Sequence, residues 1–212
     1  MKDLIPADLI SVISDNELTE KLTRASNYLP SLRCCDGKSK AVSGKFIGIG
    51  NFAICFSGGK YTDMGEGCHV LNFGFRYRAS IFDGDKPPTD FWDPESTEFQ
   101  EVTELALTPK TQGYNSGLEY LVYVPDASVF CCFYMGNYTG RHESDSMKKL
   151  VGKGAYLKNK LIKRSGGDYW GYDVLPSSLP MKLPEKPKIL AAIEIFKNPK
   201  GKQVLEETSR VR

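Results

Sequence analysis

Apolar and polar residues alternate most regularly along residues 67–81. One face of this stretch carries Leu71, Phe73, Phe75, Tyr77, Ala79 and Ile81, and the other carries Asn72, Gly74, Arg76, Arg78 and Ser80. A period of two places successive side chains on opposite sides of an extended chain. The pattern predicts a β-strand over 67–81 with its apolar face buried.

Other extended or strand-like stretches are shorter and are bounded by glycine, proline or asparagine. They cover 28–35, 46–56, 61–64, 118–124, 129–138 and 169–175. Gly48 and Gly50 predict a bulge or bend within 46–56. The sequence Pro-Asp-Ala-Ser at 125–128 predicts a hairpin connection between two of the strands.

The strongest helical pattern covers residues 144–163. Its apolar residues form most of one stripe, lysines occupy the rest, and two glycines at 166–167 end it. Shorter helices are expected within 94–107 and over 188–197. We therefore expect a mobile N-terminal arm (1–27), one β-rich globular domain (28–175) that includes helix 144–163, and a Pro-rich connector with a short C-terminal helix (176–212).

These elements together predict an α+β protein. About six short strands, one basic amphipathic helix and peripheral helices are typical of a small antiparallel β-barrel or curled sheet, resembling oligonucleotide-binding (OB) folds. The chain has 212 residues and is 41% hydrophobic, which suits one domain with a sizeable core. No stretch is long and apolar enough to span a bilayer, so we expect a cytoplasmic protein without a membrane partner.

Charge is separated along the chain, although the net charge is only +2. Residues 83–104 contain eight acidic residues and one basic residue, whereas 141–164 contain eight basic and two acidic residues. This separation predicts a surface with two signs of charge.

The cysteines do not have a metal-binding spacing. There are six, four of them in the adjacent pairs Cys34-Cys35 and Cys131-Cys132. Free thiols in a reducing compartment are the expected state. A zinc site made of Cys68, His69 and a distant cysteine pair is the alternative.

An enzyme is the least favoured class of function. The chain has only two histidines, and it contains no nucleophile elbow, phosphate-binding loop or zinc-protease motif. We expect neither a catalytic residue nor a cofactor or metal.

The interleaved aromatic residues and arginines of residues 72–78 favour binding of single-stranded nucleic acid. Bases stack on aromatic rings, and cations follow the phosphates. The predicted binding residues are Arg76, Arg78, Lys148, Lys149, Lys153, Lys160, Lys163, Tyr134, Tyr138 and Trp170. The alternative is that the aromatic residues form the core and the arginines are ordinary solvated residues.

Several segments resemble small, uncharacterised accessory proteins of bacteriophages and related mobile elements. They are Tyr28-Leu29-Pro30, Thr62-Asp63-Met64-Gly65, the stretches 93–99 and 117–125, Phe133-Tyr134-Met135-Gly136, and the stretch 157–162. The resemblance implies a viral or mobile-element origin and a role in DNA replication or recombination inside a bacterial host. It assigns no functional residue.

Two other functions remain open. The protein could be a structural or assembly component, in which segments 83–104 and 141–164 of neighbouring copies pair in a homo-oligomer. It could instead inhibit a host defence protein, or bind a replication protein, with its acidic segment mimicking nucleic acid.

Overall fold

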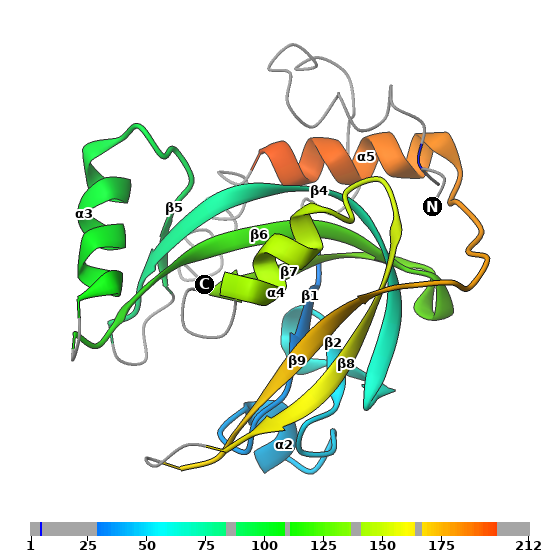
Figure 1. Cartoon of the computed structure of the whole chain (residues 1–212), viewed down its shortest axis with the longest axis horizontal. Helices are drawn as coiled ribbons and strands as arrows, with labels where there is room; N and C mark the ends of the chain where they lie inside the picture. Colours follow the sequence, from blue (N-terminus) through cyan, green and yellow to red (C-terminus); the bar gives the residue numbers. More distant parts are fainter. Residues whose placement is uncertain are drawn as a thin grey trace, which may run out of the picture.

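The fold is an open, curled sheet with helices attached to it, shown by a computed structural model (Figure 1). The structure describes Ile5 and residues 29–83, 88–108, 111–136, 141–163 and 167–198. The strands are β1 (Ser31–Cys34), β2 (Phe52–Cys55), β3 (Tyr61–Gly65), β4 (Gly67–Ile81), β5 (Thr89–Phe91), β6 (Tyr114–Val124), β7 (Val129–Gly136), β8 (Gly154–Ile162) and β9 (Tyr169–Pro176). The helices are α2 (Lys40–Ser43), α3 (Thr97–Leu107), α4 (Arg141–Lys148) and α5 (Lys186–Lys197), with short 3₁₀ turns η1 (Ser57–Gly59) and η2 (Pro125–Ala127).

The strand order is β3-β2-β1-β7-β6-β4-β8-β9, with β5 paired to β4. Every pairing is antiparallel except that of β1 with β7. The expected α+β class and mostly antiparallel sheet are confirmed, but the sheet is not closed into a barrel. The β8–β9 hairpin curls back across β1 and β2, while α5 covers the opposite side of the sheet (Figure 1).

The curl creates two cores. The inner face buries residues such as Phe52, Tyr120 and Phe133 beneath the β8–β9 hairpin and α4. The outer face packs Phe73 and Leu121 against α5, and Ile5 is buried there too. The rest of the expected N-terminal arm lies outside the described residues, as do residues 199–212 of the expected C-terminal segment.

A β-bulge in β4 overturns the prediction that one face carries all its apolar residues. The register with β6 shifts between Asn72 and Gly74, so the alternation reverses there. Phe73 therefore packs toward α5, whereas Phe75 packs against the inner core. Buried Asn72 holds the bulge, because its Nδ2 donates to Met147 O at 2.8 Å and its Oδ1 accepts from Gly74 N at 3.0 Å.

The prediction of one helix over 144–163 is wrong. Helix α4 ends at Lys148, and residues 154–162 form β8 instead. Gly152 lies between them with φ of 80°, which a right-handed helix does not allow. The turn is also fixed onto β4, since Gly152 N donates to Asn72 O and Asn72 N donates to Lys153 O.

Other predicted boundaries differ less. The strand expected over 46–56 begins only at Phe52, because α2 and its following loop use the residues before it. Strand β6 begins at Tyr114, four residues before the expected start at residue 118. None of the helices in the described part of the chain has the length and apolarity needed to cross a membrane.

Candidate nucleic-acid interface

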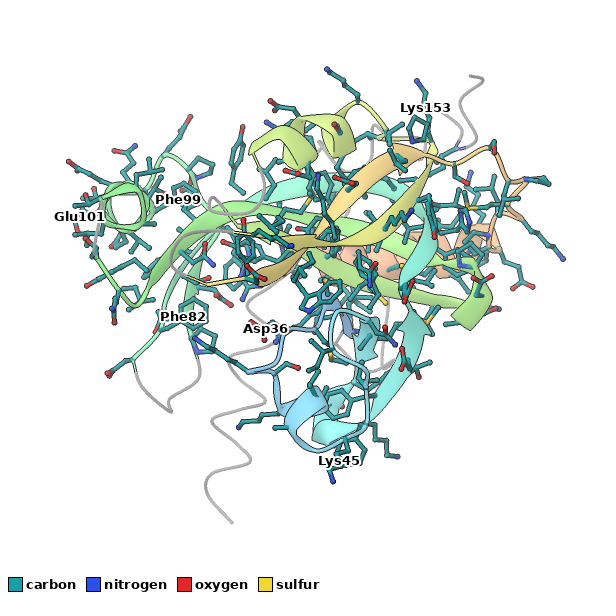
Figure 2. The ribbon with its side chains drawn as sticks, turned by 60° about the horizontal axis from the view of Figure 1, so that its bottom comes forward. Asp36, Lys45, Phe82, Phe99, Glu101 and Lys153 are labelled. Carbon is teal, nitrogen blue, oxygen red and sulfur yellow. The ribbon has the colours of Figure 1, made fainter. Side chains whose placement is uncertain are left out.

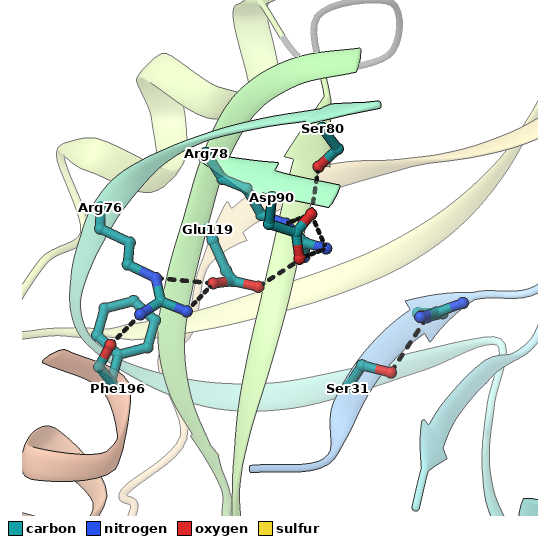
Figure 3. Close-up of polar contacts among 8 residues, drawn as sticks. Ser31, Arg76, Arg78, Ser80, Asp90, Glu119 and Phe196 are labelled. Carbon is teal, nitrogen blue, oxygen red and sulfur yellow. Dashed lines mark hydrogen bonds and ion pairs between the residues drawn. The ribbon is translucent and has the colours of Figure 1, made fainter. Parts of the chain in front are cut away.

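Four charged residues form a buried ion network on the outer face of the sheet (Figure 3). Arg76 and Arg78 on β4 both donate to Glu119 on β6, with Arg76 Nε and Arg78 Nη1 each 2.8 Å from a carboxylate oxygen. Arg78 also contacts both oxygens of Asp90 on β5, at 2.9 Å. The Asp90 carboxylate accepts a further hydrogen bond from Ser80 Oγ at 2.7 Å.

The network balances two guanidinium groups against two carboxylates. Its side chains are largely withdrawn from water, with 15% of Arg78, 9% of Asp90 and 4% of Glu119 exposed. Burial by itself lowers the pKa of Arg78, but Glu119 and Asp90 outweigh burial and raise it. Arg76 also donates to Phe196 O and lies over the rings of Phe196 and Trp92, so the network fastens α5 to the sheet.

Strands β1 and β7 separate beside this network and leave a cleft. Their parallel pairing covers only Ser31↔Cys132 and Leu32↔Phe133. Beyond those two positions, the paired residues of β1 are on β2, and those of β7 are on β6. The resulting hollow, here called the β1–β7 cleft, has a volume of about 440 Å³. This volume is within the usual range for ligand pockets, about 300–1,000 Å³.

Aromatic and polar groups from several strands line the β1–β7 cleft. Trp170 and Tyr172 come from β9, Tyr134 from β7, and Arg33 from β1. Tyr172 is held by ring contacts with Phe52 and Phe133, at centroid distances of 6.0 and 5.2 Å. The remaining lining residues are Ser31, Leu32, Cys34, Arg78, Ser80, Phe82, Pro88, Asn115, Glu119, Cys132, Phe133 and Gly136.

Tyr134 gives the cleft a polar group that the described protein does not satisfy. Its ring lies 5.1 Å from the Arg78 guanidinium carbon. Its buried hydroxyl has no hydrogen-bond partner among the described residues. Burial raises the pKa of this hydroxyl well above its ordinary value, so it stays protonated. A buried unpaired hydroxyl costs about 1–3 kcal/mol.

Arg33 differs from the arginines of the network because it forms no ion pair among the described residues. Its side chain is exposed, and its Nε donates to Ser31 Oγ at 3.1 Å. Figure 3 places Ser31 on β1, across from the network on β4 and β6. Arg33 is thus a positive charge at the rim of the cleft.

The structure brings three predicted binding residues together in the β1–β7 cleft: Arg78, Tyr134 and Trp170. Arg76 belongs to the adjoining network, and a phosphate would have to compete with Glu119 for it. Tyr138 lies outside the described residues.

The five predicted lysines do not share one helix face. Lys148 is on α4, where its Nζ lies 5.7 Å from the Phe75 ring centroid, and Lys149 and Lys153 are in the turn that follows. Lys160 on β8 donates to Asp173 at 2.9 Å, and Lys163 follows that strand. A second hollow, of about 660 Å³, separates α3 from α4 and includes Lys148, but its other walls are mostly apolar.

Sequence reasoning missed Arg33 and Glu119. Arg33 and Trp170 are far apart in sequence, and only the curl of the β8–β9 hairpin brings them together. A weak signal existed for Glu119, which is an isolated acidic residue inside the apolar stretch 118–124. A charge at such a position is retained in a core when it has a partner.

The six cysteines are all free thiols, and Cys35, Cys68 and Cys131 are buried. Burial raises the pKa of Cys34 to about 11 and that of Cys68 to about 12. The described residues contain no cluster of His, Cys, Asp and Glu suited to hold a metal ion.

We compared the chain with protein-family models, curated proteins and solved structures, and no match was found in any of the three.

Proposed function

We propose that this protein binds single-stranded nucleic acid, without catalysing a reaction, through the β1–β7 cleft. The observation that carries the proposal is the meeting of Arg78, Tyr134 and Trp170, from three separate strands, in one cleft. An unpaired base exposes both its ring face and its polar edge. The ring would stack on Trp170, and the edge would meet polar groups that line the cleft.

The charge around the cleft supports a polyanionic ligand. The ion network is balanced, so the positive field comes from residues near it. Residues 29–65 contain five basic residues (Arg33, Lys38, Lys40, Lys45 and Lys60) and two acidic residues. All five basic side chains are exposed. A backbone leaving the cleft over this region would gain salt-dependent attraction from them.

Helix α3, which carries Glu98, Glu101 and Glu104, lies away from this basic region. In Figure 2, Glu101 on α3 lies at the left edge of the molecule and Lys45 beyond α2 lies at its bottom. This separation favours a path for the strand that runs from the cleft over residues 29–65, and it disfavours a path over α3. Proteins of the OB class also bind strands on a curled antiparallel sheet, and the proposal extends that mode of binding to this fold by analogy.

The test is fluorescence anisotropy with a labelled oligo-dT at low and at moderate salt. We expect the parent protein to bind and to lose affinity as salt rises. Trp170→Ala should weaken binding about tenfold, since one stacked base contributes roughly 1–3 kcal/mol. Leu175→Ala is the matched control, because Leu175 is on the same strand, is 44% exposed and does not line the cleft.

Two results would reject the proposal. One is the absence of binding by the parent protein at low salt. The other is equal affinity for the parent and Trp170→Ala, which would place the binding surface elsewhere.

A homo-oligomer is the second candidate, favoured by the outer edge of β3. Within the described part of the chain this strand pairs only with β2. Edge strands can add a strand from another copy. Light scattering without nucleic acid would show a defined oligomer if this candidate is correct.

A further inference from the structure

The loop of residues 44–50, between α2 and β2, exposes two large apolar side chains. The side chain of Phe46 is 66% exposed and that of Ile49 is 57% exposed. Ile47, between them, is buried in a small core with Cys35, Ala41 and Ala53. The loop is thus anchored by one apolar residue and presents two others to solvent.

The backbone holds Phe46 in this position at an energetic cost. Lys45 N donates to Val42 O and Phe46 N donates to Ala41 O, which is the Schellman pattern at the end of a helix. The left-handed residue of that motif is usually glycine, but here it is Lys45, with φ of 60°. The next residue normally packs its apolar side chain onto the helix. Phe46 instead lies over Gly44 and remains 66% exposed, and the strain retained at Lys45 is of a kind common at functional positions.

The exposed ring of Phe46 is a supported platform. It stacks on Tyr61 with a centroid distance of 5.7 Å and an interplanar angle of 29°. Gly44 permits this placement, because a Cβ there would lie 2.5 Å from Phe46 Cε2. Exposed lysines flank the two rings in sequence, namely Lys45 beside Phe46 and Lys60 beside Tyr61.

The loop is continuous with the β1–β7 cleft. Gly50 ends the loop and lies against the indole of Trp170, where a Cβ on Gly50 would come within 2.6 Å of the ring. The Gly50 carbonyl also accepts hydrogen bonds from Asn159 Nδ2 at 3.0 Å and from Cys34 Sγ at 3.5 Å. A strand leaving the cleft beside Trp170 therefore meets this loop first.

We infer that Phe46 is a second base-stacking site, which takes a nucleotide next to the one held in the β1–β7 cleft. The inference rests on the proposed function and adds a direction to it, from Trp170 across Gly50 to Phe46. The ligand is single-stranded nucleic acid, because the site combines an aromatic ring with nearby lysines. A base can stack on the ring, and the lysines can bind the phosphates.

The experiment compares Phe46→Leu with Phe46→Tyr by anisotropy. Leucine keeps an apolar side chain but removes the ring face, whereas tyrosine keeps the ring. Two dT ligands are used, a single labelled nucleotide, which cannot fill both sites at once, and an oligomer of about 16 nucleotides, which can reach both. We expect Phe46→Leu to weaken binding of the oligomer roughly tenfold, to leave that of the single nucleotide nearly unchanged, and Phe46→Tyr to match the parent.

The outcomes separate this inference from the proposed function. If the parent binds and Trp170→Ala weakens it but Phe46→Leu does not, the cleft stands and the second site is wrong. An equal loss for both ligands would also overturn the inference, because it would indicate a general disturbance of the cleft. If the parent does not bind the oligomer, both proposals fail. Co-sedimentation with anionic phospholipid vesicles that needs Phe46, without an effect on oligo-dT, would assign the loop to a membrane surface instead.

Discussion

Replacing Glu119 by glutamine would test the buried ion network directly. Glu119 accepts hydrogen bonds from Arg76 and Arg78, and its side chain is only 4% exposed. Glutamine has nearly the same shape but carries no charge. One end of its amide is a hydrogen-bond donor, so one guanidinium group would face a donor in place of an acceptor.

The expected loss follows from the charges left behind. Removing one member of a buried ion pair costs about 3–5 kcal/mol, because its partners remain buried without compensation. Asp90 would then be the one carboxylate of the network left for both guanidinium groups. It contacts Arg78 but not Arg76. In a domain of this size each kcal/mol lowers Tm by about 2–4 °C, so we expect a fall of about 6–20 °C.

The assay is urea and thermal unfolding followed by circular dichroism. Asp173→Asn is the matched control, since it removes a carboxylate from the exposed pair with Lys160, whose side chains are 52% and 41% exposed. Solvent screens that pair, so the control should lose much less stability. The account of the network is refuted if Glu119→Gln is destabilised no more than Asp173→Asn.

Two more predictions concern single side chains in the sheet. Asn72→Ala should lower the free energy of unfolding in urea by about 1–3 kcal/mol, because Met147 O and Gly74 N would lose their buried partner. An unchanged stability would mean that the bulge does not depend on Asn72. Cys55 should be the most reactive thiol, because a hydrogen bond from Cys35, assisted by Arg33, lowers its pKa to about 7. Its thiolate is abundant above pH 7 and lost below it, so iodoacetamide labelling located by mass spectrometry should fall as the pH drops through 7. Preferential labelling of buried Cys68 would contradict this.

The length of β4 followed from the sequence, but the direction of its side chains did not. Its alternation of apolar and polar residues fixed the bounds 67–81, which the structure reproduces. The bulge at Asn72–Gly74 depends on a hydrogen bond to Met147, a residue 75 positions away. No local pattern records such a contact, so the faces of Phe73 and Phe75 could not be separated.

Residues 154–162 show the opposite failure. Their apolar residues fit a helical stripe as a continuation of 144–150, and the lysines between them strengthened that interpretation. The evidence against it was local, because Gly152 and Gly154 interrupt the segment. The candidate site was predicted in part, because Tyr134 and Trp170 were selected as exposed aromatics while their neighbour Arg33 has no sequence signal of its own.

The two-residue contact between β1 and β7 has a consequence for cooperativity. Among the described residues, the only ladder pairs that join β1–β3 to the rest of the sheet are Ser31↔Cys132 and Leu32↔Phe133, whereas β6 and β7 share eight paired positions. Units joined by few bonds exchange their amide hydrogens through local opening, well below the free energy of global unfolding. We predict that amide exchange will show the two walls of the cleft to be different opening units, even though Leu32 and Phe52 share the inner core with Phe133. A ligand that binds both walls would hold them together and so oppose this local opening. Its binding should slow amide exchange throughout β1–β3, including at positions that it does not contact.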